Sequence, residues 1–412
     1  MIPRDAGLEN ARVAVVHDWL PVYAGAERVL EQILAVLPQA DVYSLIEFLP
    51  DDQRAFLGER TVRTSFIQRL PFARSKYRLY LPFAPIAIEQ FDLRAYDLVV
   101  SSSYVVAKSV LTTAKQLHVS YVHSPIRYAW DLYFQYLEEG GYQRGIRSLL
   151  ARSVLHYLRL FDTMSAHRVD HFVANSGFVA ERIAKTYRRE ADVIHPPVDV
   201  KAFELGTEKD DFYLTVSRLV PYKRIDVIAE AFARLPGKRL VIVGDGPEYR
   251  RIAERSPGNV EMLGYQSNEE VLRLMQRARA FVFAAEEDFG IVPCEAQAAG
   301  TPVIGYGSGG LTETVVDGTT GVFFHRQDPE SIADAVRRFE SMESTFSPRA
   351  IREHSMQFSD ERFRFEFERY LSAKYSEFTQ RRAGGLMSTD GRGRDHADVR
   401  ALNHKLTAQG TT

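Results

Sequence analysis

The chain of 412 residues is longer than one typical core requires, so two domains of about 150 to 200 residues are expected. A hydrophobic content of 45% is normal for a globular protein, and the formal net charge of -2 gives no reason to expect a nucleic-acid partner. The single cysteine, Cys294, excludes an internal disulfide framework and favours a reducing compartment.

The N-terminal residues do not have the pattern of a targeting segment. Residues 1–16 contain no continuous apolar region of the kind found in a signal peptide. Elsewhere, no window approaches the roughly 18 uninterrupted apolar residues of a membrane span. The sequence therefore predicts a protein that is soluble or attached to a membrane surface.

The first half of the chain alternates predicted strands with helical patterns. A buried strand is predicted over 12–20 and is followed by the loop 21–26 and an amphipathic helix over 27–37. Further strand-like runs begin at residues 41, 97, 117 and 171, and a long helical pattern covers residues 144–168. Pro196 and Pro197 are expected to end regular structure in this half.

One segment of this half interleaves basic and aromatic residues. Residues 63–91 contain no acid before Phe83, and their basic residues are Arg63, Arg69, Arg74, Lys76 and Arg78. Such a mixture suits an anionic lipid interface, which would make 63–83 a membrane contact. The alternative is a helical hairpin whose apolar face packs on its own domain, and the two interpretations are compatible.

The second half restarts the same alternation. Its strand-like runs are 212–219, 239–246, 260–264, 280–285, 302–306 and 321–324. Ser267 and Glu270 form the capping-box pattern S-x-x-E at the start of a helix. This alternation predicts parallel sheets covered on both faces, and two doubly wound domains in tandem leave a cleft beyond the carboxyl ends of their strands.

The same patterns suggest domain boundaries. We expect an N-terminal domain over 1–205 and a C-terminal domain over 206–358. A helix over about 359–380, with Ser359 as its N-cap, is expected to pack back on the first domain. Residues 382–412 are rich in Gly, Asp and Arg without periodicity, which predicts a disordered tail.

Two basic residues follow the first strand of the second half. Arg218 ends that predicted strand, and Lys223 lies near the start of the next helix. A guanidinium and an ammonium beside helix amides suit a diphosphate, although two solvated residues flanking a turn would show the same pattern. The turn "VGDGPE" adds Gly244 and Gly246, where the backbone can approach a ligand or simply adopt positive φ.

A glycine-rich loop and two carboxylates complete the candidate residues. Gly307, Gly309 and Gly310 precede a helix predicted from Leu311; exposed amides there suit an anion or a sugar hydroxyl, and a flexible loop is equally compatible. Glu287 follows an apolar strand, and Glu295 lies in a helix whose first turn accommodates Pro293. A carboxylate at a helix start is also stabilised by the helix dipole without any ligand.

Carboxylates accept two hydrogen bonds at once from paired sugar hydroxyls. One acid on each side of the turn "DFGIVP" could therefore bind two parts of one glycosidic ligand, with the amides of 289–292 near its phosphate.

The combination resembles a known family. The run "EDFGIVPCEAQAAGTPVI" is similar to the E-x7-E signature of retaining glycosyltransferases of family 4 (group 1). These have the GT-B fold, an α/β architecture in which two Rossmann-like, doubly wound parallel-sheet domains face each other across a cleft. The resemblance covers most of 211–325, including "SRLVPYKRID", "LVIVGDGPE" and "GSGGLTETVVDGTTGVFF".

The first half resembles the family more loosely. "HDWLPVYAGAERV" is similar to its first loop, with Ala24 in place of the first glycine of a pair and Gly25 as the second. "YVHSPIRYAWDLY" resembles the pattern H-x-P-x-R-Y-x-W-D of bacterial polysaccharide and O-antigen mannosyltransferases. This second likeness is the reason to favour GDP-mannose as the donor.

The resemblance implies roles for individual residues. Arg218 and Lys223 would neutralise the donor diphosphate and the departing nucleoside diphosphate. Glu287 would contact hydroxyls of the donor sugar, and Glu295 would contact the nucleotide ribose. His123 would lie near the reactive face of the donor sugar.

Further contacts are implied around this centre. Gly25 would lie near the phosphates and the acceptor, and the backbone at Tyr265 would lie beside the base. Asp18 and Arg127 are added as acceptor-side or sugar contacts. The remaining expected donor-binding residues are Gly244, Phe289, Gly290, Ile291 and Val292.

The function implied is transfer of a hexose, with retention, from a nucleotide-sugar to a lipid-linked oligosaccharide or polysaccharide precursor. The favoured donor is GDP-mannose and the favoured acceptor is linked to a polyprenyl diphosphate, at the cytoplasmic face of the cell membrane. No cofactor and no metal are expected, in line with the lack of a D-x-D after a strand and of a His/Cys cluster.

Three alternatives stay open. A UDP-sugar-dependent glucosyl- or galactosyltransferase of the same fold is the nearest. A sugar-nucleotide 2-epimerase would share the two-domain plan but act without an acceptor. A non-catalytic nucleotide-sugar-binding or scaffold protein is the third.

Overall fold

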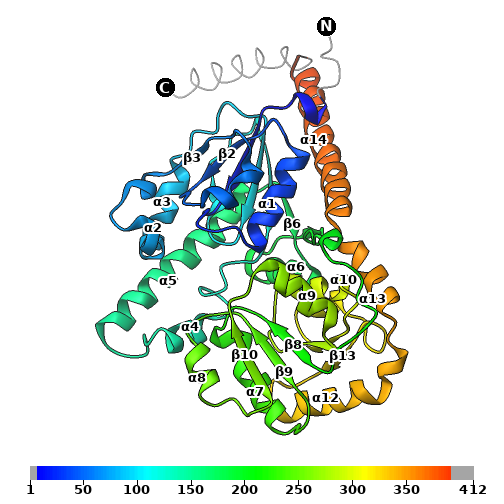
Figure 1. Ribbon diagram of the computed structural model, residues 1–412. Coiled ribbons are helices and arrows are strands. Elements are labelled where there is room, and N and C mark those ends of the chain that lie inside the picture. The colour runs from blue at the N-terminus through cyan, green and yellow to red at the C-terminus, as the bar shows by residue number, and fades with distance from the viewer. Residues whose placement is uncertain (1–6, 391–412) are drawn as a thin grey trace, which may run out of the picture. The chain divides into compact units, whose positions relative to one another are not determined.

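The computed structural model describes residues 7–390 (Figure 1). By its contacts the chain forms two units, one over residues 12–367 and one that joins the segment before Arg12 to the segment after Phe367. The first unit contains both sheets and the candidate site. Of the second, the structure describes a short 3₁₀ turn, Leu8–Asn10, and the later part of helix α14 (Asp360–Asp390).

Seven parallel strands of the described residues form the first sheet, in the order β3-β2-β1-β4-β5-β6-β7. Their bounds are Val13–His17 (β1), Asp41–Ser44 (β2), Val62–Thr64 (β3), Leu98–Ser103 (β4), Leu117–Val122 (β5), His171–Ala174 (β6) and Ala191–Val193 (β7). The α-helices of this part are Gly25–Val36 (α1), Ala73–Lys76 (α2), Ala84–Glu89 (α3), Tyr133–Glu139 (α4), Gly145–Ser165 (α5) and Gly177–Tyr187 (α6). The strand order reverses beside β1, which creates the kind of switch point where doubly wound sheets bind ligands.

Six parallel strands of the described residues form the second sheet, in the order β10-β9-β8-β11-β12-β13. Their bounds are Tyr213–Val216 (β8), Leu240–Val243 (β9), Val260–Gly264 (β10), Ala280–Phe283 (β11), Val303–Tyr306 (β12) and Gly321–Phe324 (β13). The α-helices here are Ile225–Ala233 (α7), Tyr249–Ala253 (α8), Asn268–Arg277 (α9), Ile291–Ala298 (α10), Leu311–Thr314 (α11), Pro329–Met342 (α12) and Pro348–Ser355 (α13). This sheet reverses its order between β8 and β11.

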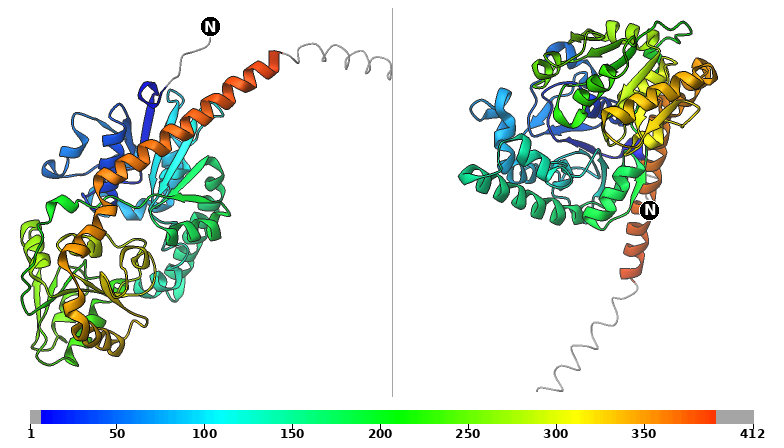
Figure 2. Two further views of the ribbon diagram at one scale, coloured as in Figure 1. Left: turned by 90° about the vertical axis from the view of Figure 1, so that its right-hand side faces the viewer. Right: turned by 90° about the horizontal axis from the view of Figure 1, so that it is seen from below.

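The central strands are buried on both faces, which is why they read as apolar runs rather than as alternating patterns. Every residue of β1, β4, β5, β9 and β11 is buried. Two clusters of buried apolar side chains cover the two faces of the second sheet, and Figure 2 shows helices on both sides of the strands. The prediction of two doubly wound parallel-sheet domains is confirmed.

The predicted strands are found where the sequence has apolar runs, and two short strands were missed. β3 and β7 have three residues each, occupy the two edges of the first sheet and are only partly buried. An edge strand lacks a neighbour on one side, so it needs no continuous apolar run. β7 lies in the segment where Pro196 and Pro197 were expected to close this half.

The basic and aromatic segment is helical after β3. It contains the 3₁₀ helices Phe66–Arg69 (η4) and Tyr77–Phe83 (η5) as well as α2 and α3. Ile67, Ala84 and Ile88 are buried in the core of the first sheet's domain. The expectation that part of this segment packs on its own domain is confirmed, and its exposed residues are considered below.

The predicted helix caps are found in place. The Ser267 hydroxyl accepts a hydrogen bond from the Glu270 amide at 3.3 Å, and the Ser359 hydroxyl accepts one from the Arg362 amide at 3.3 Å. At the start of α14, Phe363 and Phe367 make edge contacts with Tyr121 of β5, at 5.8 and 6.1 Å between ring centroids.

The later part of α14 corrects one expectation. The helix continues to Asp390, so residues 382–390, expected to be disordered, are helical; residues 391–412 lie outside the described part of the chain. The boundaries at 205/206 and 358/359 stay predictions.

Candidate active site

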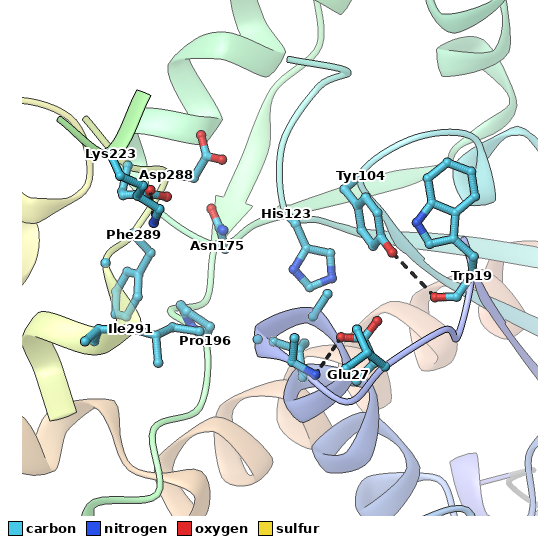
Figure 3. A pocket seen from close by; sticks show the side chains of 18 of the residues that line it. Trp19, Glu27, Tyr104, His123, Asn175, Pro196, Lys223, Asp288, Phe289 and Ile291 are labelled. Atoms are coloured by element: carbon cyan, nitrogen blue, oxygen red, sulfur yellow. Dashed lines mark hydrogen bonds and ion pairs between the residues drawn. The ribbon is translucent and has the colours of Figure 1, made fainter. Parts of the chain in front are cut away.

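A cavity of about 460 Å³ lies at the carboxyl ends of strands from both sheets (Figure 3). Figure 3 shows His123 and Glu27 on one side, and Lys223 and Phe289 on the other. Eight of the predicted site residues line this cavity: Gly25, His123, Lys223, Glu287, Phe289, Gly290, Ile291 and Val292. A set of residues spread over 268 positions of sequence therefore meets in one place.

An ion pair joins the two charged residues of the second sheet's side of the cavity. The ammonium of Lys223 contacts the carboxylate of Glu287. Burial opposes the charge on Lys223, but the neighbouring Glu287 raises the pKa of Lys223 above its ordinary value, so this side chain stays cationic. The pair brings a cation and a hydroxyl acceptor together, as a diphosphate joined to a sugar requires.

Arg127 lies beside the same carboxylate. Its Nη1 atom is 3.9 Å from Glu287 Oε2 and 3.6 Å from Asp288 Oδ2, and its Nη2 donates to the backbone oxygen of Glu286 at 3.2 Å. Its side chain lines an adjacent cavity of about 420 Å³ together with Tyr222. Arg127 therefore contacts the loop that carries Glu287.

The glycine-rich loop after β12 supports the backbone of that turn. The Gly310 amide donates to the backbone carbonyl oxygen of Glu287 at 2.8 Å, and a Cβ on Gly310 would lie 2.3 Å from the backbone carbonyl oxygen of Asp288. Gly309 has φ +68°, and a Cβ added to it would lie 2.6 Å from the backbone carbonyl oxygen of Glu287. The two glycines are therefore required for close packing, which sequence alone could not separate from anion binding. Helix α11 begins at Leu311 as predicted but has only four residues.

The glycines after β9 act in a similar way. A Cβ on Gly244 would lie 1.8 Å from the backbone carbonyl oxygen of Ser217, and one on Gly246 would lie 2.3 Å from that of Leu219. Both contacts are with the backbone around Arg218. The Arg218 side chain is exposed and has no hydrogen bond or ion pair within residues 7–390, and Tyr265 is also exposed.

A chain of hydrogen bonds that sequence reasoning missed orients His123. Ser102 Oγ is 2.8 Å from His123 Nε2 and 3.1 Å from His17 Nδ1, and His17 Nε2 is 3.4 Å from Glu27 Oε1. His17 and Ser102 are directly opposite each other in the register of β1 and β4, and His123 follows β5. The motif "VHDW" and the serine run at 101–103 were the only sequence signals.

The chain has one set of donor and acceptor roles that satisfies all three of its contacts. A carboxylate oxygen accepts hydrogen bonds, so Glu27 Oε1 accepts from His17 Nε2, and His17 Nδ1 accepts the Ser102 hydroxyl proton in the arrangement that satisfies both contacts. Ser102 Oγ then accepts from His123 Nε2, which leaves His123 Nδ1 as an acceptor. Burial, and then His17, lower the pKa of His123 to about 3, so the ring is neutral near pH 7.

Asp18 does not line the cavity, and its expected acceptor-side role stays a prediction. It is fully buried, and its carboxylate accepts four backbone hydrogen bonds, from Tyr104 (2.6 Å), Val105 (2.8 Å), Val106 (2.6 Å) and Ala107 (2.7 Å). Asp18 thus holds the loop after β4, whose Tyr104 lines the cavity.

Glu295 lies apart from Glu287, and the roles expected for the two acids at the ribose and at the donor sugar stay predictions. Its carboxylate pairs with Arg28 of α1, and it lines a second cavity of about 300 Å³ with Tyr23 and Asp199. Burial raises the pKa of Glu295, although Arg28 acts in the opposite direction. Sequence did not indicate Arg28 as its partner.

The turn after β11 also contacts α6. Arg182 Nη1 is 2.5 Å from Asp288 Oδ1, and the Ser176 hydroxyl donates to the backbone carbonyl oxygen of Asp288 at 2.5 Å. The carboxylate of Glu313 accepts from the first two amides of α6, at 2.8 and 3.0 Å. These contacts fix the cavity's two sides to each other. Within the described residues, no group of three or more His, Cys, Asp or Glu side chains is placed to hold a metal ion.

Two family models match the chain in succession. Residues 23–202 match the model "Glycosyltransferase Family 4", and residues 199–357 match "Glycosyl transferases group 1". The chain belongs to this glycosyltransferase family. The predicted E-x7-E run, Lys223 and the glycine turns all lie within the second match.

Relatives and solved structures agree with this assignment. D-inositol 3-phosphate glycosyltransferase of Mycolicibacterium smegmatis is 30% identical over 216 residues, which are 46% of this chain and 50% of the relative. The corresponding enzyme of Mycobacterium avium is 31% identical over 193 residues, 40% of this chain and 45% of the relative. The chain thus spans about half the length of the curated relatives it matches.

The structural neighbours show the same fold. HepE of Anabaena in complex with UDP-glucose has a TM-score of 0.64 at 17% identity, over 88% of this chain and 99% of HepE. Sucrose-phosphate synthase of Thermosynechococcus elongatus has a TM-score of 0.69 at 18% identity, over 89% of this chain and all of the neighbour. The two-sheet architecture of this glycosyltransferase is therefore the GT-B fold of its neighbours.

Proposed function

We propose that this glycosyltransferase moves a hexose, with retention, from a nucleoside diphosphate sugar bound in the cavity between the two sheets. The observation that carries the proposal is the Lys223–Glu287 ion pair, because it faces His123 across a cavity lined by both sheets. Lys223 would stabilise the negative charge that develops on the leaving diphosphate. Arg218 would contribute to this if its exposed side chain changed rotamer towards the cavity. Glu287 and His123 would accept hydrogen bonds from the sugar's hydroxyls.

The proposed reaction balances without a cofactor or a metal. The bond from the anomeric carbon to the diphosphate oxygen breaks, and a bond to the acceptor oxygen forms on the same face. The acceptor proton passes to the leaving diphosphate. Glu287 is paired with Lys223 and is assigned to binding rather than to attack on the anomeric carbon, which distinguishes it from a glycosidase nucleophile.

GDP-mannose is the donor we favour. The support is the segment 123–131, which resembles a pattern of bacterial mannosyltransferases and whose His123 lines the cavity. Its Arg127 contacts the loop of Glu287, and its Asp131 pairs with Arg182. The proposed acceptor is a polyprenyl-diphosphate-linked oligosaccharide, reached at the inner face of the cell membrane; no helix of the described residues is long and apolar enough to cross a membrane.

A UDP-sugar donor is the second candidate, because HepE was solved with UDP-glucose and shares the fold. Donor binding separates the two. Melting temperatures would be measured in EDTA with GDP-mannose, UDP-glucose, UDP-galactose and UDP-N-acetylglucosamine. A ligand at 100 times its Kd stabilises by about 2.7 kcal/mol, which gives a clear shift. Stabilisation by a UDP-sugar alone would refute the mannosyl assignment and leave the transferase assignment intact.

Matched variants test the site itself. Lys223→Gln and Glu287→Gln should abolish the shift or lower transfer about a hundredfold or more, which is typical of losing one preorganised electrostatic contact. Lys185→Gln and Glu181→Gln make the same charge changes at exposed positions of α6 and should behave as wild type. Unchanged transfer in Glu287→Gln would place the active site elsewhere, and turnover of a UDP-sugar without acceptor would indicate an epimerase.

A further inference from the structure

Helix α5 carries an apolar stripe on its exposed side. The stripe consists of Ile146, Leu149, Leu150, Tyr157, Leu160 and Met164, which follow one another at spacings of one to seven residues along one side of the helix. Ile146 is 81% exposed, Leu149 63% and Leu150 66%. The opposite side of the helix is also apolar, and its Leu155 and Leu158 are buried in the core. A helix that is apolar on both sides needs a partner on its exposed side.

The helix has a neighbour of the same character. The segment 66–86 exposes Phe72, Leu79 and Phe83, of which Phe72 is 74% exposed and Leu79 71%. Both segments pack on one core cluster, to which the segment 66–86 contributes Ile67 and Ala84 and α5 contributes Leu158. Arg168, three residues beyond α5, forms an ion pair with Glu89 at the end of α3 at 2.6 Å. Figure 1 shows α2, α3 and α5 on the same side of the first sheet.

Both segments are basic. The sequence has no acid from residue 60 to residue 88, nor from residue 140 to residue 161. The first stretch exposes Arg69, Arg74, Lys76 and Arg78, and the second exposes Arg144 and Arg147 beside Ile146. The surface formed by the exposed side chains of 66–86 and of α5 therefore combines apolar groups with positive charge and contains no carboxylate of its own.

This surface adjoins the proposed active site. Tyr77 and Arg78, which belong to the segment 66–86, line the cavity of about 460 Å³ that also contains Lys223. A surface held at a lipid interface through this segment would bring the cavity close to that interface.

We propose that α5 and the segment 66–86 together form a docking surface for an anionic lipid bilayer, with the α5 stripe entering the headgroup region. A bilayer supplies both an apolar layer and negative charge, which match the two properties of the surface. A second copy of this chain would supply an apolar face but no negative charge, because a symmetric contact would bring its basic residues against each other. The proposal deepens the proposed function, since it states where a lipid-linked acceptor would be met.

Vesicle co-sedimentation tests the proposal without any donor. The probes are vesicles of phosphatidylcholine alone and of phosphatidylcholine with phosphatidylglycerol. The full chain should bind the anionic vesicles, and binding should weaken in 0.5 M NaCl because salt screens the basic residues. Leu149→Asp/Leu150→Asp should weaken that binding at least tenfold, and Phe72→Asp/Leu79→Asp should do the same for the other segment.

The matched control is Val316→Asp/Met356→Asp, which changes two apolar residues that are 43% and 42% exposed outside this surface. It adds the same charge and should bind vesicles as wild type does. Binding by Leu149→Asp/Leu150→Asp equal to wild type, or no binding of wild type to anionic vesicles, would overturn the proposal. Loss of a wild-type dimer in that variant, measured by sedimentation, would instead identify a second copy as the occupant.

Donor-induced shifts in melting temperature, measured on the same variants, separate this proposal from the proposed function. They should match wild type whether or not vesicles bind, because the substituted residues lie outside the lining of the cavity.

Discussion

Replacing Asp18 with Asn tests the role that the structure gives to this residue. The two carboxylate oxygens accept two backbone amides each, over distances of 2.6 to 2.8 Å, and the side chain is fully buried. An asparagine keeps one acceptor oxygen and points its own NH₂ group at the other two amides. The substitution therefore removes two hydrogen bonds to a charged acceptor and leaves two buried donors without a partner.

The size of the effect follows from those two bonds. A hydrogen bond to a charged group contributes about 1.5 to 3 kcal/mol, so the loop after β4 should lose about 3 to 6 kcal/mol. Since every 1.4 kcal/mol is a factor of ten, amide exchange at residues 104–107 should become at least a hundredfold faster. Transfer should also fall, because Tyr104 of this loop lines the cavity.

The assay is hydrogen exchange followed by mass spectrometry on a peptide covering residues 104–107, together with the melting temperature. Asp52→Asn makes the same change at an exposed position and should alter stability by no more than about 0.5 kcal/mol. Unchanged exchange in Asp18→Asn, combined with a raised KM for the acceptor, would refute this reasoning and support the acceptor-side interpretation.

Three further predictions concern the site and its surroundings. Gly310→Ala should lower kcat at least tenfold, because its Cβ would lie 2.3 Å from the Asp288 oxygen and displace the turn of the site; a kcat equal to wild type would contradict this. Arg28→Ala should tighten donor binding several-fold in calorimetry, because it releases Glu295 for the ribose; weaker binding would show that Arg28 itself contacts the donor. His118 has its pKa lowered to about 4 by burial, so the unfolded chain, with a histidine pKa near 6.5, binds more protons between these values. Stability should therefore be complete above pH 6.5 and fall as the pH drops towards 4, with a smaller fall in His118→Gln; a melting temperature that rises on acidification would contradict the assignment.

The fold could be predicted as far as burial leaves a mark on the sequence. β1, β4 and β5 lie in the middle of the first sheet and read as apolar runs, because both of their faces are covered. β3 and β7 lie at its edges and carry partly exposed residues, so their sequences "VRT" and "ADV" do not differ from loops. The extent of α14 was underestimated because Gly384 and Gly385 are poor helix formers, and local propensity was the only guide there.

The candidate site could be predicted where strands end, and not where partners come from elsewhere in the chain. His123, Lys223 and Glu287 follow strands of parallel sheets, whose carboxyl ends meet at one edge, so their meeting follows from the fold class. The Arg28–Glu295 pair joins residues 267 positions apart, and no local pattern indicates it. Asp18 also follows a strand, which made it look like a site residue, yet its four amide partners begin 86 positions later.

The structure gives the two acids of the E-x7-E run different surroundings, and the start of α10 lies between them. Glu287 precedes Gly290, whose φ of +93° turns the chain into the helix, and Glu295 is the fifth residue of that helix. The backbone at 289–292 lines the cavity of Glu287, whereas Glu295 lines the second cavity. In a nucleotide-sugar the diphosphate lies between the sugar and the ribose, just as the start of α10 lies between Glu287 and Glu295. A helix N-terminus favours an anion such as this diphosphate. The separation of the acids is therefore compatible with one extended donor, provided that Arg28 leaves Glu295. For this reason Arg28, one turn beyond Gly25, is the side chain whose position would decide whether the proposed ribose site at Glu295 is open or occluded.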